Sequence, residues 1–184
     1  MSEPVVAVAG LGRCGTSLVM QMLAAGGLPT VGTFPAFEVP DGVAQPGQAV
    51  KWIDPHRLPN PFGGDDALVV WLTRDHEEQA RSQLKMIRVL FGIRAGGQRE
   101  RFARSLERDE RLAFRVIARW PVIHLTFEDL IRAPQVSTAR LVIFLRPCFP
   151  DLDGPAMARC VLPRTSRCQP GVEIEQRLIA QAAP

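Results

Sequence analysis

An apolar segment, a glycine-rich turn and an amphipathic segment follow one another near the amino terminus, and this succession limits the fold more than any other feature. Residues 4–9 (PVVAVA) are typical of a short, buried parallel strand. The turn at residues 10–15 is followed by a helical pattern over Thr16–Ala25, which ends at two glycines. A strand, a glycine turn and a helix in this order are typical of the start of an α/β domain that binds a nucleotide.

The turn and the first helical residues read GLGRCGTS, a sequence suited to holding a phosphate group. Its glycines let backbone N–H groups converge on an anion, and the following helix adds the partial positive charge of its N-terminus. Gly10, Gly15 and Ser17 match the G-x-x-x-x-G-K-[ST] pattern of P-loop proteins, but Thr16 replaces the lysine. ATP or GTP hydrolysis is therefore disfavoured, and Arg13 inside the loop can supply the missing cation.

The same turn also satisfies the dinucleotide fingerprint G-x-G-x-x-G through Gly10, Gly12 and Gly15. That fingerprint requires an acidic residue about 20 positions further on, at the end of a second strand. Residues 33–37 (TFPAF) contain no acid, and no clear strand precedes them. A nicotinamide- or flavin-binding domain is therefore an alternative, as are a P-loop kinase of a small metabolite and a glycine turn that binds no ligand.

Further along the chain, apolar runs alternate with helical patterns, and this alternation predicts a parallel sheet flanked by helices. Strands are expected at residues 49–53, 68–73 and 122–126, and helices at residues 76–91, 98–119, 128–145 (broken at Pro134) and, near the carboxyl terminus, 172–182. Asp75 and Glu78 form a capping-box pattern before the first of these helices. The predicted fold class is α/β: three αβα layers around a central parallel sheet, as in P-loop nucleoside triphosphate hydrolases.

The composition disfavours several classes of protein. Lys and Arg total 22 and Asp and Glu total 19, and the resulting net charge of +3 suits a phosphorylated small ligand but is too weak to indicate nucleic acid. The four cysteines have neither CxxC spacing nor histidines at zinc-ligand distances, so we expect free thiols and no metal site. No apolar run approaches the roughly 20 residues of a membrane span, and the start MSEP is unlike a signal peptide. We expect a cytoplasmic protein.

The loop and its continuation resemble a known family. The segment GLGRCGTSL is similar to the G-x-x-[RK]-S-G-T-[ST] loop of sulfotransferases, and the following LVMQMLAAGGLP is similar to bacterial members of that superfamily. In the family this loop binds the 5′-phosphosulfate of 3′-phosphoadenosine 5′-phosphosulfate (PAPS). The resemblance implies that the donor is bound by Gly12, Arg13, Cys14, Gly15, Thr16 and Ser17. Cys14 stands where the family has a serine, and a thiol is a poor substitute for a hydroxyl donor.

A second resemblance concerns the 3′-phosphate of the donor. Sulfotransferases place an arginine at the end of a strand and a serine eight residues later, and Arg74 and Ser82 occupy these positions here. Arg74 also stands out without the resemblance, because it lies at the carboxyl end of a strand and beside a helix N-terminus. Ser82 is expected about 12 Å further along the helix, so the long arginine side chain must close the gap. An ion pair of Arg74 with Asp75 or Glu78 is the alternative role.

A third resemblance surrounds Lys51, in the segment AVKWIDPH. This segment is similar to the family's middle strand, which carries a lysine before the acceptor site and, in many members, a histidine base two residues later. Ile53 occupies that histidine position, so a different base is expected. His56 is one candidate, since a histidine can exchange a proton near neutral pH. Glu38 is the other, because it follows Phe37 in an aromatic–acid pair similar to that of related bacterial sequences.

The segment IHLTFEDL at residues 123–130 is similar to the family's late strand and its E-D-L turn, and we interpret it as structural. Together the resemblances cover most of residues 4–146 and imply a single sulfotransferase-like P-loop domain over residues 1–184. Within it, the proline-rich segment 28–47 is expected to be an acceptor or lid loop, whereas the C-terminal region 147–184 has no match in the family.

The resemblance implies transfer of a sulfuryl group from PAPS to a hydroxyl or amine of an unknown small-molecule, carbohydrate or natural-product acceptor, with 3′-phosphoadenosine 5′-phosphate (PAP) as the product. Arg13, Lys51 and the loop amides would stabilise the charge on the leaving phosphate. Glu38 or His56 would remove the acceptor's proton, and no metal is expected. Two alternatives stay open: a catalytically degenerate relative that binds a nucleotide or a partner protein, and the small-metabolite kinase.

Overall fold

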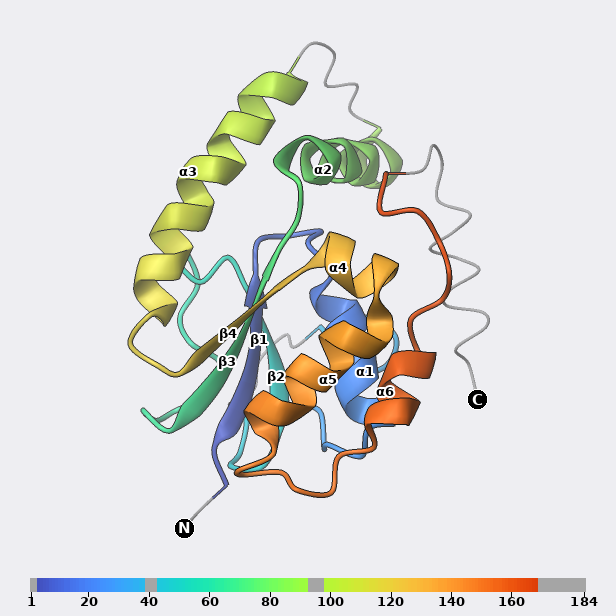
Figure 1. Cartoon of the computed structure of the whole chain (residues 1–184). Coiled ribbons are helices and arrows are strands. Elements are labelled where there is room, and N and C mark those ends of the chain that lie inside the picture. Colours follow the sequence, from blue (N-terminus) through green and yellow to red (C-terminus); the bar gives the residue numbers. More distant parts are fainter. Residues whose placement is uncertain (1–2, 39–42, 93–97, 169–184) are drawn as a thin grey trace.

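The computed structural model describes residues 3–38, 43–92 and 98–168. Its elements are β1 (Val5–Gly10), α1 (Thr16–Ala25), β2 (Ala49–Ile53), β3 (Ala67–Thr73), α2 (His76–Phe91), α3 (Arg99–Ile117), β4 (Val122–Thr126), α4 (Phe127–Arg132), α5 (Pro134–Leu145) and α6 (Gly154–Arg159). The predicted fold class is confirmed, because a parallel sheet lies between helices on both of its faces (Figure 1).

The four strands form one parallel sheet in the order β2-β1-β3-β4. Gly10 of β1 pairs with Ile53 of β2 and with Leu72 of β3, so the carboxyl ends of these three strands meet at one edge. The chain passes from β1 to β2 through α1 on one face, and from β3 to β4 through α2 and α3 on the other. The direction of winding therefore reverses between β1 and β3, and open α/β sheets bind ligands in the crevice at such a point.

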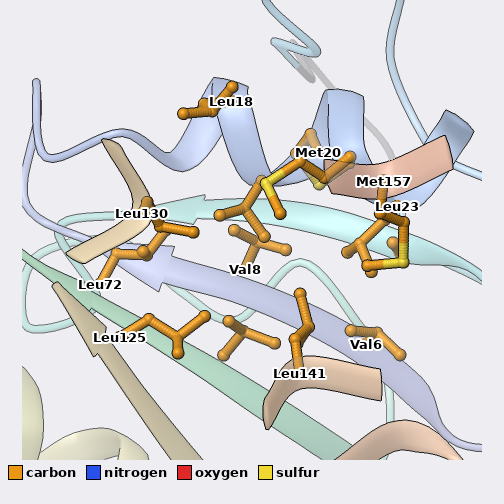
Figure 2. Close-up of a cluster of buried hydrophobic side chains, with 14 of the residues drawn as sticks. Val6, Val8, Leu18, Met20, Leu23, Leu72, Leu125, Leu130, Leu141 and Met157 are labelled. Atoms are coloured by element: carbon orange, nitrogen blue, oxygen red, sulfur yellow. The ribbon is translucent and has the colours of Figure 1, made fainter. Parts of the chain in front are cut away.

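One face of the sheet packs against α1, α4, α5 and α6. Figure 2 shows Val6 and Val8 of β1 facing side chains from these helices, among them Leu23, Leu141 and Met157. All five side chains have no exposed surface, and burying one valine or leucine side chain contributes about 1.5–3 kcal/mol. Both faces of β1 are covered, which explains why its sequence is a continuous apolar run.

The opposite face packs against α3, whose buried stripe includes Leu106 and Ile117. Next to it, Trp52, Phe62 and Trp120 form a cluster of rings in edge-to-face contact, with centroids 5.4 to 5.8 Å apart. Such aromatic pairs add to the stabilisation from buried area. This second core fixes the position of β2, which carries one of the predicted site residues.

The elements agree with the sequence-based expectations to within one or two residues, and the break at Pro134 separates α4 from α5. Helix α6 was not expected, although Asp153 caps it by accepting from the Ala156 N–H at 2.8 Å. The expected helix at residues 172–182 lies outside the described residues. None of the helices in the described ranges has the length and apolar character that a membrane span needs.

The expected capping box of α2 forms only in half. Asp75 accepts from the Glu78 N–H at 3.0 Å, as the pattern predicts. The Asp75 N–H, however, donates to the carboxylate of Glu128 at 3.2 Å instead of to Glu78. The carboxylate of Glu78 is taken up elsewhere, because it accepts from the Cys168 N–H at 2.6 Å. Two distant segments of the chain therefore meet at the start of α2.

Candidate functional site

The phosphate loop, residues 10–17, joins β1 to α1 at the carboxyl edge of the sheet. Its backbone is left-handed at Arg13 (φ 70°) and at Gly15 (φ 107°), the residue that precedes α1. Within the part of the chain that the structure describes, the N–H groups of Gly15 and Ser17 donate to no acceptor. The loop thus gathers unpaired donors and the positive end of a helix, the arrangement that binds a phosphate group.

Close packing under the loop explains why residues 10 and 15 are glycines. A Cβ atom at Gly10 would lie 2.4 Å from the sulfur of Cys14 and 2.9 Å from the carbonyl oxygen of Leu72. A Cβ atom at Gly15 would lie 2.8 Å from the ring of Phe127, and the positive φ there disfavours any side chain. A side chain at either position would displace the loop.

Two side chains of the loop point into the protein rather than toward a ligand. Cys14 has no exposed surface, and burial raises the pKa of its thiol to about 12. Thr16, at the position of the P-loop lysine, is only 3% exposed. The side chains of these two residues therefore support the loop from below. The Cys14 N–H donates to the carbonyl oxygen of Leu11 at 3.3 Å, so the N–H groups left for an anion are those of Gly15 and Ser17.

Arg74 and Ser82, predicted from the sequence as a pair, both contact Arg13. The Arg13 Nε donates to the Ser82 hydroxyl at 3.1 Å. The Arg74 Nη1 donates to the carbonyl oxygen of Arg13 at 3.3 Å. The separation expected along the helix, about two turns from Arg74 to Ser82, is closed by Arg13, whose carbonyl oxygen contacts Arg74 while its side chain reaches Ser82.

Two glutamines on α2 hold the loop, and neither was identified from the sequence. The Nε2 atoms of Gln79 and Gln83 both donate to the carbonyl oxygen of Gly12, at 2.8 and 2.9 Å. Gln79 is 1% exposed, which is unusual for a glutamine and reflects this contact. A signal was present in the sequence: Gln79, Ser82 and Gln83 recur at the i, i+3, i+4 spacing of one helix face.

The groups in direct contact with the Arg74 guanidinium are uncharged, and the carboxylates of Glu78 and Glu128 act on it from beyond ion-pair distance. Its Nη2 donates to the carbonyl oxygen of Ser166 at 2.7 Å, and its central carbon lies 4.4 Å from the centroid of the Phe127 ring. In the described ranges it forms no ion pair with Asp75 or Glu78, and its buried Nε has no hydrogen-bond partner. Burial also lowers the pKa of Arg74. An unpaired buried donor is costly, and a bound anion would remove that cost.

A second set of contacts converges on Lys51 of β2. Its ammonium donates to the Ser17 hydroxyl at 3.0 Å and to the carbonyl oxygen of Ala36 at 2.9 Å, and it forms an ion pair with Glu38. The side chain of Lys51 is 5% exposed, whereas that of Glu38 is 71% exposed. A buried cation therefore lies at the start of α1, directly beside a carboxylate that solvent can reach.

His56 lies against α3. Its Nε2 accepts from the Arg57 Nε at 3.0 Å and lies 3.8 Å from a carboxylate oxygen of Asp109, which is 6% exposed. Within the described ranges, no hydrogen bond joins His56 to Lys51 or to the phosphate loop. The structure thus brings Glu38, but not His56, into contact with the lysine.

The predicted site residues form two groups around the phosphate loop. Arg13, Arg74 and Ser82 meet on the side of α2, and Ser17, Lys51 and Glu38 meet on the side of β2. In the parts of the chain that the structure covers, no cluster of three His, Cys, Asp or Glu side chains is placed to hold a metal ion. The arrangement can bind an anionic ligand with phosphate groups and can offer it both a cation and a proton acceptor.

Comparisons by sequence find no relative, since neither a protein-family model nor a curated protein matches the chain. Solved structures do match. Retinol dehydratase in complex with retinol and PAP has a TM-score of 0.54 at 16% identity, over 85% of this chain and 63% of that one. A mouse sulfotransferase in complex with PAP has a TM-score of 0.58 at 12% identity, over 85% of this chain and 62% of that one.

The sulfotransferase domain of the curacin biosynthetic pathway has a TM-score of 0.57 at 12% identity, over 98% of this chain and 97% of that one. The fold is that of the sulfotransferases. The chain spans about 63% of the length of retinol dehydratase but nearly the whole curacin domain. At these identities the likeness establishes the fold, and the activity has to be argued from the site residues.

Proposed function

We propose that the chain is a sulfotransferase that moves a sulfuryl group from PAPS to a hydroxyl or amine group of a small acceptor. The observation that carries this proposal is the contact of Lys51 with both Ser17 and Glu38 beside the phosphate loop. The lysine can offset negative charge on a leaving phosphate, and the carboxylate next to it can accept a proton. Sulfuryl transfer to a hydroxyl needs both.

The residues present fit a donor with two phosphate positions. The N–H groups of Gly15 and Ser17 suit the 5′-phosphosulfate, because they are unpaired and lie at the start of α1 in the described structure. Arg74 and Ser82, on the other side of Arg13, suit the 3′-phosphate. The unpartnered Nε of Arg74 supports this assignment, since an added phosphate oxygen would satisfy it.

Bound PAPS would supply the activated sulfuryl group, and PAP would be the product. The chain would hold donor and acceptor in line, with Arg13 and Lys51 offsetting the charge of the leaving phosphate. Glu38 would take the proton of the acceptor. We prefer Glu38 to His56 in this role because its carboxylate contacts Lys51, whereas His56 accepts from Arg57 against α3.

The kinase alternative receives less support from these contacts. In P-loop enzymes the hydroxyl at the position of Ser17 binds Mg²⁺, and a lysine at the position of Thr16 reaches the phosphates. Here the Ser17 hydroxyl accepts from Lys51, and Thr16 is buried. A catalytically degenerate relative would share the donor site and differ only in lacking turnover, so an assay of transfer separates it from an active enzyme.

The chain has only two lysines, Lys51 and Lys85, which provide a matched pair for the test. Release of PAP from PAPS would be measured with EDTA and a panel of phenolic, steroid and carbohydrate acceptors. Lys51→Met should reduce turnover roughly 100-fold or more, the usual effect of losing a group that stabilises developing charge, whereas Lys85→Met should stay within about twofold of the wild type.

Turnover by Lys51→Met at the wild-type rate would contradict the proposal. Binding of PAP by the wild type without turnover on any acceptor would favour the degenerate relative. Binding of ATP in preference to PAP, and only with Mg²⁺, would favour the kinase.

A further inference from the structure

Phe127, the first residue of α4, lies directly under the phosphate loop. Its side chain is 7% exposed, and a Cβ atom on Gly15 would lie 2.8 Å from its Cδ2 and 3.5 Å from its Cε2. The backbone of the loop therefore rests on the edge of this ring. From the sequence alone, the segment around Phe127 is interpreted as structural, and its ring has no expected part in ligand binding.

The face of the same ring is in contact with arginines from two distant segments. The guanidinium carbon of Arg74 lies 4.4 Å from the ring centroid, and that of Arg164 lies 5.5 Å from it. Both distances fall within the roughly 6 Å over which an aromatic ring attracts a cation. Arg74 follows β3, and Arg164 belongs to the segment after α6, so the ring joins the loop, the sheet edge and the C-terminal part of the described chain.

The contact with an uncharged ring has a consequence for the chemistry of Arg74. Its other partners, the carbonyl oxygens of Arg13 and Ser166, are also uncharged. A carboxylate in the same place would hold the side chain equally well but would neutralise it. An aromatic face and two carbonyl groups fix the guanidinium without forming an ion pair, so its charge stays available to an anion although Glu78 and Glu128 act on it from further away.

We propose that Phe127 is a positioning residue for the 3′-phosphate of the donor. Its ring holds Arg74 beside the phosphate loop, and in this way it sets the preference of the site for a nucleotide bisphosphate over the corresponding 5′-monophosphate. The inference rests on the proposed function. Phe127 acts through Arg74, so its removal should change which nucleotide is bound rather than abolish binding.

The test is titration calorimetry of the full chain with PAP and, separately, with adenosine 5′-phosphate. Phe127→Leu keeps an apolar side chain but removes the ring. It should weaken PAP binding about fivefold to tenfold, the size of a partly buried cation–π contact, and should weaken adenosine 5′-phosphate binding less than about twofold. Phe127→Tyr keeps the ring face and should restore the wild-type preference.

Phe149→Leu provides a matched control for the loss of a buried ring. Phe149 is also 7% exposed and belongs to the same hydrophobic cluster, but it follows α5 and has no contact with Arg74 in the described structure. Thermal unfolding should show a similar loss of stability in both leucine variants. Only Phe127→Leu should change the ratio of the two affinities.

A double-mutant cycle with Arg74→Ala distinguishes positioning from simple support of the loop. If the ring acts through the arginine, Phe127→Leu should have no further effect on the affinity ratio once Arg74 is alanine. Equal weakening of both nucleotides by Phe127→Leu, or the same change of ratio with and without Arg74, would overturn the inference. A wild-type chain without preference for PAP would overturn the proposed donor site itself, and the role of Phe127 with it.

Discussion

At the scale of single residues, the pair formed by Lys51 and Glu38 carries the proposed chemistry. Lys51 is almost fully buried and is satisfied by a hydroxyl, a carbonyl oxygen and the carboxylate, which is what a buried ammonium requires. Glu38 is largely exposed, so an acceptor can approach it from solvent. The pair can therefore serve the donor and the acceptor at once.

Separate substitutions of the two candidate bases, Glu38 and His56, test which of them accepts the proton. Glu38→Gln keeps the shape of the side chain but cannot accept a proton, so it should lower kcat roughly 100-fold while PAP binding changes little. His56→Gln should leave kcat within about threefold of the wild type, because His56 faces Arg57 and Asp109. Both values come from initial rates of PAP release. A large loss for His56→Gln together with normal turnover for Glu38→Gln would reverse the assignment.

Cys14 should make the stability of the fold depend on pH in alkaline solution. Its pKa is raised from 9.0 to about 12 by burial, so the folded state keeps the proton that the unfolded state loses. The stability that this proton contributes is complete below about pH 9 and is lost as the pH rises from 9 toward 12. Urea unfolding of the wild type should therefore shift to lower midpoints over this range.

Cys14→Ala removes the titrating group and should flatten that dependence between pH 8.5 and 10.5. Cys148→Ala is the matched control for the loss of a thiol, since Cys148 is only partly buried. If the midpoint of urea unfolding fell equally steeply with pH in the wild type and in Cys14→Ala, another group would cause the alkaline loss of stability.

At the scale of elements, the phosphate loop is the part with least tolerance for change. Gly15→Ala adds a methyl group 2.8 Å from the Phe127 ring at a position with φ 107°. It should destabilise the fold by about 1–3 kcal/mol and weaken nucleotide binding. Gly64→Ala is the control, because no atom lies within 4 Å of its added methyl group. Urea unfolding that gives both variants the same stability would contradict the close packing of the loop.

The elements themselves could be predicted from the sequence because their signals are local. Residues 5–10 and 67–73 are apolar runs that need both faces covered, and Asp75 caps α2 through a residue only three positions away. The partners of the same elements could not be predicted. The Asp75 N–H binds Glu128, which lies 53 residues away, and no local pattern indicates that contact.

In the candidate site, too, contacts between residues distant in the sequence could not be predicted. Arg74 stood out by its place at the end of a strand, and Ser82 was found only through a family resemblance. Their meeting at Arg13 depends on how α2 passes the loop, with Arg13 and Ser82 lying 69 residues apart. Gln79 was missed although it shares one helix face with Ser82 and Gln83, and Phe127 was missed because a core phenylalanine carries no distinctive signal by itself. Helix α6 was missed although Asp153 before Pro155 is a recognisable helix start.

At the scale of the whole molecule, the site exists only when the fold is complete. Its residues come from the loop after β1, from β2, from the end of β3, from α2 and from the segment after α6. They meet at the carboxyl edge of the sheet, where the winding reverses between β1 and β3. In the proposed function, this edge of the sheet would bind both phosphate positions of the donor.

Titration calorimetry of the wild-type chain with PAP, adenosine 5′-phosphate, NAD and ATP with Mg²⁺ tests the central claim most directly. We expect micromolar binding of PAP that needs no metal, and weaker binding of adenosine 5′-phosphate because that ligand has no second phosphate for Arg74 to bind. Preference for ATP with Mg²⁺ or for NAD, or equal affinity for the two adenosine phosphates, would contradict this claim.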